Sequence, residues 1–397
     1  MRGARGVAPV AILLALAACE RKRPAEGVAA AAPAAAAPAP GQPLLLGHVA
    51  SLTGNEATFG DSTEKGIRLA VDERNAGGGV AGHPVAIRTY DDQGKPEEAA
   101  IVATRLAVED RAQVLLGEVA SKRSLAMAPI ADRYQVPMVT PSSTNPKVTV
   151  ENDQVHPYVF RVCFIDPFQG GVMARFARQT LHLSRVAVLR DVGNDYSVGL
   201  ADFFLARFRA LGGEVVDDES YKAGDQDFKA QLTAIKAHRP EAIYVPGYYT
   251  DVALIARQAR ELGMAQPLLG GDGWDSAKLF EISRGALEGS YFSDHYSAED
   301  PSPAIQGFVS RYRTRFGAVP DSMAAMGYDA ARIAMDAMAR ARDLTGPAIR
   351  DALAATRGFA GITGTISIDA HHDAVKPAVV LQVVNGAGKF VAAVQPD

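Results

Sequence analysis

Polar and aromatic residues recur in this sequence directly after apolar runs, at the points where strands are expected to end. They are Ser121, Ser142, Thr144, Tyr196, Tyr248, Tyr249, Asp272 and Trp274. In an open α/β sheet, ligands bind at the carboxyl ends of the strands. Each residue singly could be a helix cap or a turn residue. Their recurrence after successive strand ends favours a shared binding site.

The chemistry suited to this set is recognition of a zwitterion. Ser121 falls at the expected start of a helix, where backbone N–H groups and the helix dipole attract a carboxylate. Asp272, with hydroxyls or carbonyls, would hold an ammonium, and aromatic rings would enclose a side chain. A charge-assisted hydrogen bond gives about 1.5 to 3 kcal/mol, and burial of a leucine-sized side chain gives about as much. A micromolar complex needs only about 8 kcal/mol.

Three other motifs resemble metal, catalytic or dinucleotide sites but lack the context that such sites need. The stretch LLGGDGWDS resembles a metal loop or a catalytic acid, but no second ligand set or nucleophile accompanies it, and Asp275 is expected to cap the next helix. GGGVAG (residues 77–82) matches G-x-G-x-x-G, yet a helix precedes it and a strand follows, the reverse of a dinucleotide site. His371 and His372 are adjacent on an expected turn, and adjacent residues on a turn rarely bind the same ion. We therefore expect no metal and no cofactor.

An enzyme is also not expected. The sequence lacks G-x-S-x-G, H-E-x-x-H and a phosphate loop ending in Gly-Lys-Ser/Thr. A hydrolase built on Ser121 or Ser142 would need a histidine within a recognisable motif, and none is present. The residues favour a binding protein.

The elements that must position these residues alternate along the chain from Leu44 onward. Apolar runs such as VLLG, RVAVLR and AIYVPG are continuous, as in strands covered by helices on both faces. The order is βαβαβ, and it restarts near RVAVLRD, so we expect two doubly wound α/β lobes with parallel sheets. The late runs GTISID and PAVVLQVVN are expected to add to sheets already begun, so the chain must pass between the lobes more than once.

The N-terminus has the features of a secretory signal. Two arginines precede a short apolar run, and residues 16–19, LAAC, resemble the lipobox of bacterial lipoproteins. We expect a signal peptide over residues 1–18, lipidation of Cys19, and an Ala/Pro-rich tether over residues 19–43. The protein would then be periplasmic and held at a membrane by lipid alone. A net charge of −4 without a basic block argues against nucleic acid.

Several of these segments, in one order, resemble the periplasmic solute-binding proteins of ABC transporters of the leucine/isoleucine/valine-binding type. They include VLLGEVASKRS, VPMVTPSSTNP, GYYTDVALIARQAR and LLGGDGW, within a similarity from Leu44 to about Phe390. The resemblance implies the type I fold, with two lobes joined by three hinge crossovers. The lobes are expected over residues 44–164 plus 295–370 and over residues 165–294 plus 371–397. It also implies a monomer that delivers an amino acid to an ABC permease.

The resemblance further implies roles for single residues. Ser121 and Thr144 would bind the ligand carboxylate, and Asp272, with Ser142 and Thr144, the ammonium. Tyr196 and Tyr248 would come from the second lobe, while Phe59, Trp274 and Tyr328 would shape the side-chain pocket. Relatives often carry a glutamate at Asp272, a tyrosine at Phe59, and a disulfide at positions matching Gly94 and Ala120. The ligand could instead be an amide, urea, a γ-amino acid or an aromatic acid, and the receptor could serve a signalling protein.

Overall fold

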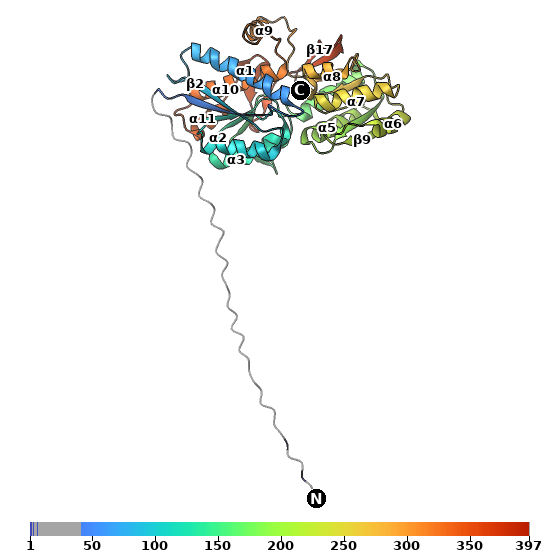
Figure 1. Cartoon of the computed structure of the whole chain (residues 1–397), viewed down its shortest axis with the longest axis horizontal. Helices are drawn as coiled ribbons and strands as arrows, with labels where there is room; N and C mark the ends of the chain where they lie inside the picture. The colour runs from blue at the N-terminus through green and yellow to red at the C-terminus, as the bar shows by residue number, and fades with distance from the viewer. Residues whose placement is uncertain (2, 4–5, 7–40, 397) are drawn as a thin grey trace. The chain divides into compact units, whose positions relative to one another are not determined.

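The computed structural model describes residues 1, 3, 6 and 41–396 (Figure 1). The expected signal peptide, the lipidation site Cys19 and most of the tether therefore lie outside the described residues. Among the residues described, no helix combines the length and the apolar composition needed to cross a membrane.

The first lobe is built on a five-stranded parallel sheet in the order β2-β1-β3-β4-β7. Its strands are β1 (Leu44–Ala50), β2 (Val85–Asp91), β3 (Val114–Leu116), β4 (Met138–Thr140) and β7 (Val159–Arg161). Its helices are α1 (Ala57–Ala76), α2 (Pro96–Val108), α3 (Ser121–Tyr134), α9 (Pro303–Phe316), α10 (Ser322–Arg340) and α11 (Gly346–Ala354). A short 3-10 helix, η1 (Pro146–Val148), and a two-stranded ribbon, β5 (Val150–Glu151) with β6 (Gln154–Val155), precede β7.

Two apolar cores cover the two faces of this sheet. Leu44 and Leu46 of β1 pack in one core with residues of α1 and α10. Leu115 and Met138, which point to the other face, pack with residues of α2 and α3. Because side chains alternate between the faces of a strand and both faces are buried, every position of these strands can be apolar.

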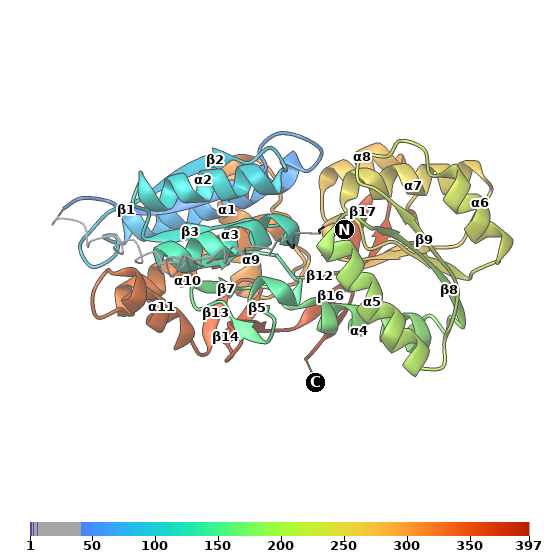
Figure 2. The ribbon, with the colours of Figure 1, turned by 90° about the horizontal axis from the view of Figure 1, so that it is seen from below.

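The second lobe contains a seven-stranded sheet in the order β17-β16-β12-β11-β10-β8-β9. Its strands are β8 (Arg185–Asp191), β9 (Glu214–Tyr221), β10 (Ala242–Tyr244), β11 (Leu268–Gly270), β12 (Tyr291–Asp294), β16 (Ala378–Val384) and β17 (Ala387–Val394). Its helices are α4 (Asp166–Arg175), extended by the π-helix η2 (Phe176–Thr180), α5 (Asp195–Ala210), α6 (Lys229–Ala237), α7 (Tyr249–Glu261), the 3-10 helix η3 (Asp272–Trp274) and α8 (Ala277–Ser283). Helices α4 and α5 cover one face, and α6, α7 and α8 the other (Figure 2).

The chain passes between the two lobes three times. The crossovers run from β7 to α4, from β12 to α9, and from β15 (Ala374–Val375) to β16. Strands β8 to β12 pair in parallel, and β16 and β17 add to the same sheet in the antiparallel sense. The two doubly wound lobes expected from the sequence, and the three crossovers that the resemblance implied, are thus confirmed.

One of the two late runs does not behave as expected. PAVVLQVVN forms β16 and pairs with β12, as expected. GTISID, however, forms β14 (Gly364–Ile368), which among the described strands pairs with β13 (Phe359–Gly361) and β15 alone, in a separate small sheet. Since β15 belongs to this small sheet, the expected start of the second lobe's last segment at residue 371 comes too early. The strands of the second lobe resume at β16.

Candidate ligand-binding site

A small cavity lies between the lobes, at the carboxyl ends of strands from both sheets. Its lining residues are Phe59, Val119, Ala120, Ser121, Ser142, Tyr196, Tyr248, Asp272, Gly273 and Met323. Its volume is about 10 Å³, which is room for about one water-sized sphere. An amino acid does not fit in this conformation, so the lobes must part or the lining side chains must move before a ligand enters.

The first lobe contributes hydroxyl groups and the beginning of a helix. Ser121 is the first residue of α3, and its Oγ accepts a hydrogen bond from the backbone N–H of Asn145 (3.2 Å). Ser142 Oγ donates to the carbonyl of Val119 (3.1 Å). The positive end of the α3 dipole and these two hydroxyls make this wall of the cavity suited to an anion.

The buried residue Glu118 holds these loops in place. Its carbonyl accepts hydrogen bonds from the hydroxyls of Ser124 (2.7 Å), Thr140 (2.7 Å) and Ser143 (2.9 Å). Its carboxylate accepts the backbone N–H of Ala120 at 2.6 Å. The hydroxyl-bearing loops after β3 and β4 are therefore fixed to one another before any ligand binds.

A buried ion pair ties α3 to the loop before α1. Arg123 Nη2 lies 2.6 Å from the Glu56 carboxylate, and Arg123 Nε lies 2.8 Å from that of Glu118. Burial raises the pKa of Glu56, and Arg123 opposes the shift. Because Glu56 precedes Phe59 by three residues, this pair helps to fix the ring that enters the cavity.

The second lobe contributes a buried carboxylate, Asp272, on η3. Its Oδ1 accepts hydrogen bonds from Gln169 Nε2 (2.8 Å) and the Tyr196 hydroxyl (2.9 Å). Its Oδ2 lies 3.1 Å from His295 Nε2. Only 3% of Asp272 is exposed. Gln169, Tyr196 and His295 thus hold its carboxylate inside the cavity wall.

Aromatic rings from both lobes close the rest of the cavity. Tyr196 and Tyr248 stack with ring centroids 5.3 Å apart, and Phe59 of the first lobe meets Tyr248 edge-on at 5.7 Å. Phe59 also meets Tyr249 edge-on at 4.9 Å. Burial raises the pKa of Tyr196 and of Tyr248 well above the usual range, so both hydroxyls stay neutral. Apart from the Asp272 carboxylate and the hydroxyl groups, the walls of the cavity are thus apolar.

A family model described as a periplasmic binding protein matches residues 43–389 of this chain. The chain belongs to the periplasmic binding protein family. Family membership confirms the expectation of a binding protein instead of an enzyme. It also agrees with a cavity between two α/β lobes that holds polar groups at strand ends and no nucleophile–histidine pair among its lining residues.

Named relatives are similar over most of the chain. The Leu/Ile/Val-binding protein BraC3 of Rhizobium johnstonii is 32% identical over 271 residues, 68% of this chain and 72% of that protein. The structure of the leucine-binding protein LivK from Thermotoga maritima has a TM-score of 0.85 and 42% identity, covering 89% of this chain and 99% of its own. LivJ from Streptococcus pneumoniae, in complex with isoleucine, has a TM-score of 0.82 and 32% identity, covering 88% and 99%. The resemblance to branched-chain amino-acid-binding proteins of ABC transporters is therefore confirmed.

Six of the residues singled out in the sequence line the cavity of this periplasmic binding protein, but Thr144, Tyr249, Trp274 and Tyr328 do not. The six are Phe59, Ser121, Ser142, Tyr196, Tyr248 and Asp272. Trp274 is fully buried in the core of the second lobe, where its Nε1 donates to the Val245 carbonyl (3.0 Å). A Cβ on Gly270 would lie 2.0 Å from the indole, so Trp274 requires glycine beneath it. The structure places this ring in the protein core and not against the cavity.

Tyr328 and Thr144 also lie away from the lining. The Tyr328 hydroxyl donates to Glu73 (2.5 Å) and accepts from Arg311 (3.3 Å), in contacts that join α10 to α1 and α9. Thr144 is fully buried, and its carbonyl accepts the backbone N–H of Asp166 (2.9 Å), at the first crossover. Both residues take part in packing around the site instead of forming its surface.

The structure adds Gln169, His295 and Met323 to the site, none of which we expected. His295 follows β12 directly, so the strand-end pattern that indicated Asp272 extends to this residue as well. Met323 lies in the first turn of α10, and its sulfur lies 3.4 Å from Ser142 Oγ. Gln169 lies in the first turn of α4, after a crossover, where no local sequence pattern marks it.

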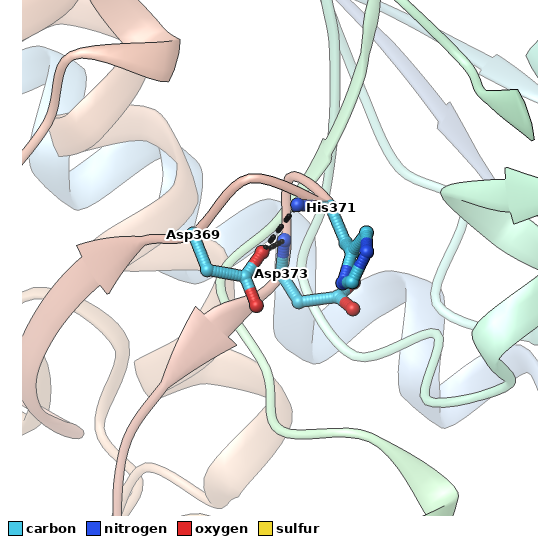
Figure 3. Close-up of side chains that lie close together, drawn as sticks. All are labelled: Asp369, His371 and Asp373. Atoms are coloured by element: carbon cyan, nitrogen blue, oxygen red, sulfur yellow. Dashed lines mark hydrogen bonds between the residues drawn. The ribbon is translucent and has the colours of Figure 1, made fainter.

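The side chains of His371 and His372 lie in different surroundings. The His372 ring stacks on Phe160, with centroids 4.0 Å apart, while His371 is exposed. His371 does lie near Asp369 and Asp373 (Figure 3). Asp369 Oδ1, however, accepts the backbone N–H groups of His371 (2.8 Å) and Asp373 (2.9 Å), which shapes the turn. Asp373 pairs with Arg161 Nε at 2.6 Å. Both carboxylates of this turn thus have structural partners, Asp369 within the turn and Asp373 on β7.

Proposed function

We propose that this protein is an extracytoplasmic receptor that captures an aliphatic amino acid, of the branched-chain class, between its lobes and delivers it to an ABC permease. The observation that carries the proposal is the opposition of two groups across one cavity. Ser121, at the N-terminus of α3, and Ser142, in the loop after β4, would bind the ligand carboxylate, and Asp272 would bind its ammonium. The rings of Phe59 and Tyr248 would enclose the side chain.

The named relatives support this ligand class. BraC3 is a Leu/Ile/Val-binding protein, LivK a leucine-binding protein, and LivJ was solved with isoleucine. An aromatic acid or another ligand without an ammonium would leave the Asp272 carboxylate without a cationic partner in a closed, dry site, which is costly. The carboxylate therefore favours an amino acid over the other ligands taken by this fold.

Lobe closure and ligand capture would be linked. The closed conformation already has hydrogen bonds between lobes, from Asn145 Nδ2 to the Asp195 carbonyl (2.8 Å) and from Thr250 Oγ1 to the Asn55 carbonyl (2.7 Å). A ligand held by Ser121 in one lobe and Asp272 in the other would add contacts that only the closed state offers. Such differential contacts are what shift an equilibrium between two conformations.

We also propose that the receptor acts as a monomer held at a membrane by lipid on Cys19. Support comes from the sequence LAAC at residues 16–19 and the Ala/Pro-rich tract that follows. Such a tract would act as a tether, since polyproline-like chain extends about 3.1 Å per residue. Mass spectrometry of the membrane-extracted protein would test this. A mature chain that begins after Cys19, or that carries no lipid, would refute the anchor.

Isothermal titration calorimetry of the purified receptor with each standard amino acid, urea, γ-aminobutyrate and benzoate tests the ligand class. We expect heat with leucine, isoleucine or valine, and none with benzoate. The variant Asp272→Ala should lose at least about a hundredfold in affinity, because it removes the only carboxylate in the lining. Asp202→Ala, on the exposed face of α5, is the matched control. Absence of binding to any amino acid by the unaltered protein would refute the proposal.

A further inference from the structure

The side chain of His295 connects the Asp272 carboxylate to the hinge. His295 directly follows β12 and begins the second crossover, and it is 2% exposed. Its Nε2 lies 3.1 Å from Asp272 Oδ2, and its backbone N–H donates to Asp294 Oδ1 (2.7 Å). A movement of the second crossover would therefore act directly on the ligand-facing carboxylate.

The same imidazole also contacts the first crossover. Its ring lies on that of Phe164, with centroids 3.9 Å apart and planes inclined by 31°. Phe164 follows β7 and precedes α4, and its ring in turn meets Phe168, in the first turn of α4, at 5.8 Å. Residues from two of the three crossovers thus meet at His295, and the ring has little freedom to turn.

The hydrogen bonds of Asp272 show what His295 would control. A carboxylate offers about four acceptor positions, two on each oxygen. Gln169 and Tyr196 occupy both positions on Oδ1, whereas His295 occupies one on Oδ2. The position left for a ligand ammonium is therefore on Oδ2, the oxygen that His295 holds.

The imidazole can hold this oxygen without cancelling its charge. Burial lowers the pKa of His295, and the opposing effect of Asp272 is smaller. A neutral imidazole with its proton on Nε2 donates one hydrogen bond to Oδ2 and leaves the carboxylate charged. A protonated imidazole would form an ion pair with Asp272 and compete with the ammonium.

We propose that His295 is a positioning residue that orients Oδ2 of Asp272 toward the ligand ammonium and links this orientation to the crossovers that form the hinge. The proposal rests on the proposed function only in taking Asp272 as the ammonium anchor. It predicts that loss of the Nε2 donor weakens ligands that carry an ammonium and spares ligands that lack it.

A pair of variants separates the donor from the ring. His295→Phe keeps a ring against Phe164 but removes the donor, whereas His295→Gln keeps an N–H near the position of Nε2. Calorimetry would compare L-leucine with isocaproate, which has the same carbon chain without the ammonium, and the weaker binding of isocaproate would be measured by its competition with leucine at high concentration. We expect His295→Phe to weaken leucine about 10- to 100-fold and isocaproate less than about twofold, and His295→Gln to restore leucine to within about threefold. Equal losses for both ligands, or a Gln variant as weak as the Phe variant, would overturn the proposal.

An experiment on the ligand-free protein separates failure of this inference from failure of the proposed function. NMR of the imidazole nitrogens should show His295 as the neutral Nε2–H tautomer, and Asp272→Ala should shift the Nε2 resonance. An Nδ1–H tautomer, or a resonance unaffected by Asp272→Ala, would refute the positioning role even if leucine binds. If the unaltered protein binds no amino acid, the proposed function fails, and this measurement alone decides the role of His295. The NMR measurement also decides the role of His295 if the variant His295→Phe fails to fold.

Discussion

Asp275 of the second lobe accepts a hydrogen bond from the backbone N–H of Ser322, the first residue of α10 in the first lobe, at 2.6 Å. The sequence led us to expect Asp275 as the cap of the next helix, but Ser276 caps α8, with its Oγ accepting the N–H of Lys278 (3.2 Å). Asp275 is free to reach across the lobe interface because its neighbour performs the capping. It places a carboxylate at the positive end of α10 only when the lobes are closed.

Asp275→Ala should therefore weaken amino-acid binding without unfolding either lobe. A carboxylate bonded at a helix N-terminus contributes about 1 to 2 kcal/mol, so we expect affinity to fall about 5- to 30-fold. Calorimetry with leucine measures the change. Asp202→Ala removes an exposed carboxylate, paired with Arg190 at 2.6 Å, and should leave affinity unaltered. Equal affinity of Asp275→Ala and the unaltered protein would show that this contact does not stabilise the closed state.

Trp274→Phe should lower stability and leave affinity within about twofold. The indole packs in the core and donates to Val245, and it does not line the cavity. Loss of one buried hydrogen bond and of part of a large ring costs about 2 to 4 kcal/mol. Differential scanning calorimetry would report the loss as a lower melting temperature. A fivefold or larger change in leucine affinity would instead assign Trp274 to the ligand pocket.

Gly66→Ala should destabilise the first lobe. A Cβ at Gly66 of α1 would lie 1.9 Å from the backbone oxygen of Ala324 on α10, so the two helices would have to separate. Overpacking of this kind costs about 1 to 3 kcal/mol, or several degrees in melting temperature. Gly77→Ala, at the end of the same helix, is the control, because its Cβ would meet no atom closer than 3.5 Å. Similar melting temperatures for the two variants would contradict the close contact.

Asp166→Asn should flatten the pH dependence of stability. Burial raises the pKa of Asp166 to about 8, with a smaller opposing effect from the Thr144 hydroxyl. A raised folded-state pKa contributes stability that is complete below the unfolded pKa of about 4 and is lost as the pH rises through about 8. The melting temperature of the unaltered protein should therefore fall between about pH 4 and about pH 8, and that of Asp166→Asn should fall less.

Asp166→Asn should keep part of the slope, because burial also raises the pKa of Asp92 and of Asp251 to about 7. Asp202→Asn, which removes an exposed carboxyl, should leave the slope unchanged. Parallel slopes for Asp166→Asn and the unaltered protein would mean that Asp166 is ionised in the folded protein.

The sequence alone determined the two doubly wound lobes, because strands buried on both faces must be apolar along their whole length. It also located much of the cavity, since the carboxyl ends of parallel strands share one edge of a sheet. Ser121, Ser142, Tyr196 and Asp272 line the cavity for this reason. These inferences need only local pattern and chain order.

Tertiary structure decided which side chains face the ligand and which partners they have. Asp272 and Trp274 are two residues apart on η3, and in a helix with about three residues per turn such residues point in different directions. One therefore enters the cavity and the other the core. GTISID is clearly strand-like, but its partners β13 and β15 are fixed by packing. Gln169 and His295 meet Asp272 only because two crossovers bring distant segments together, and local sequence carries no record of contacts closed over that distance.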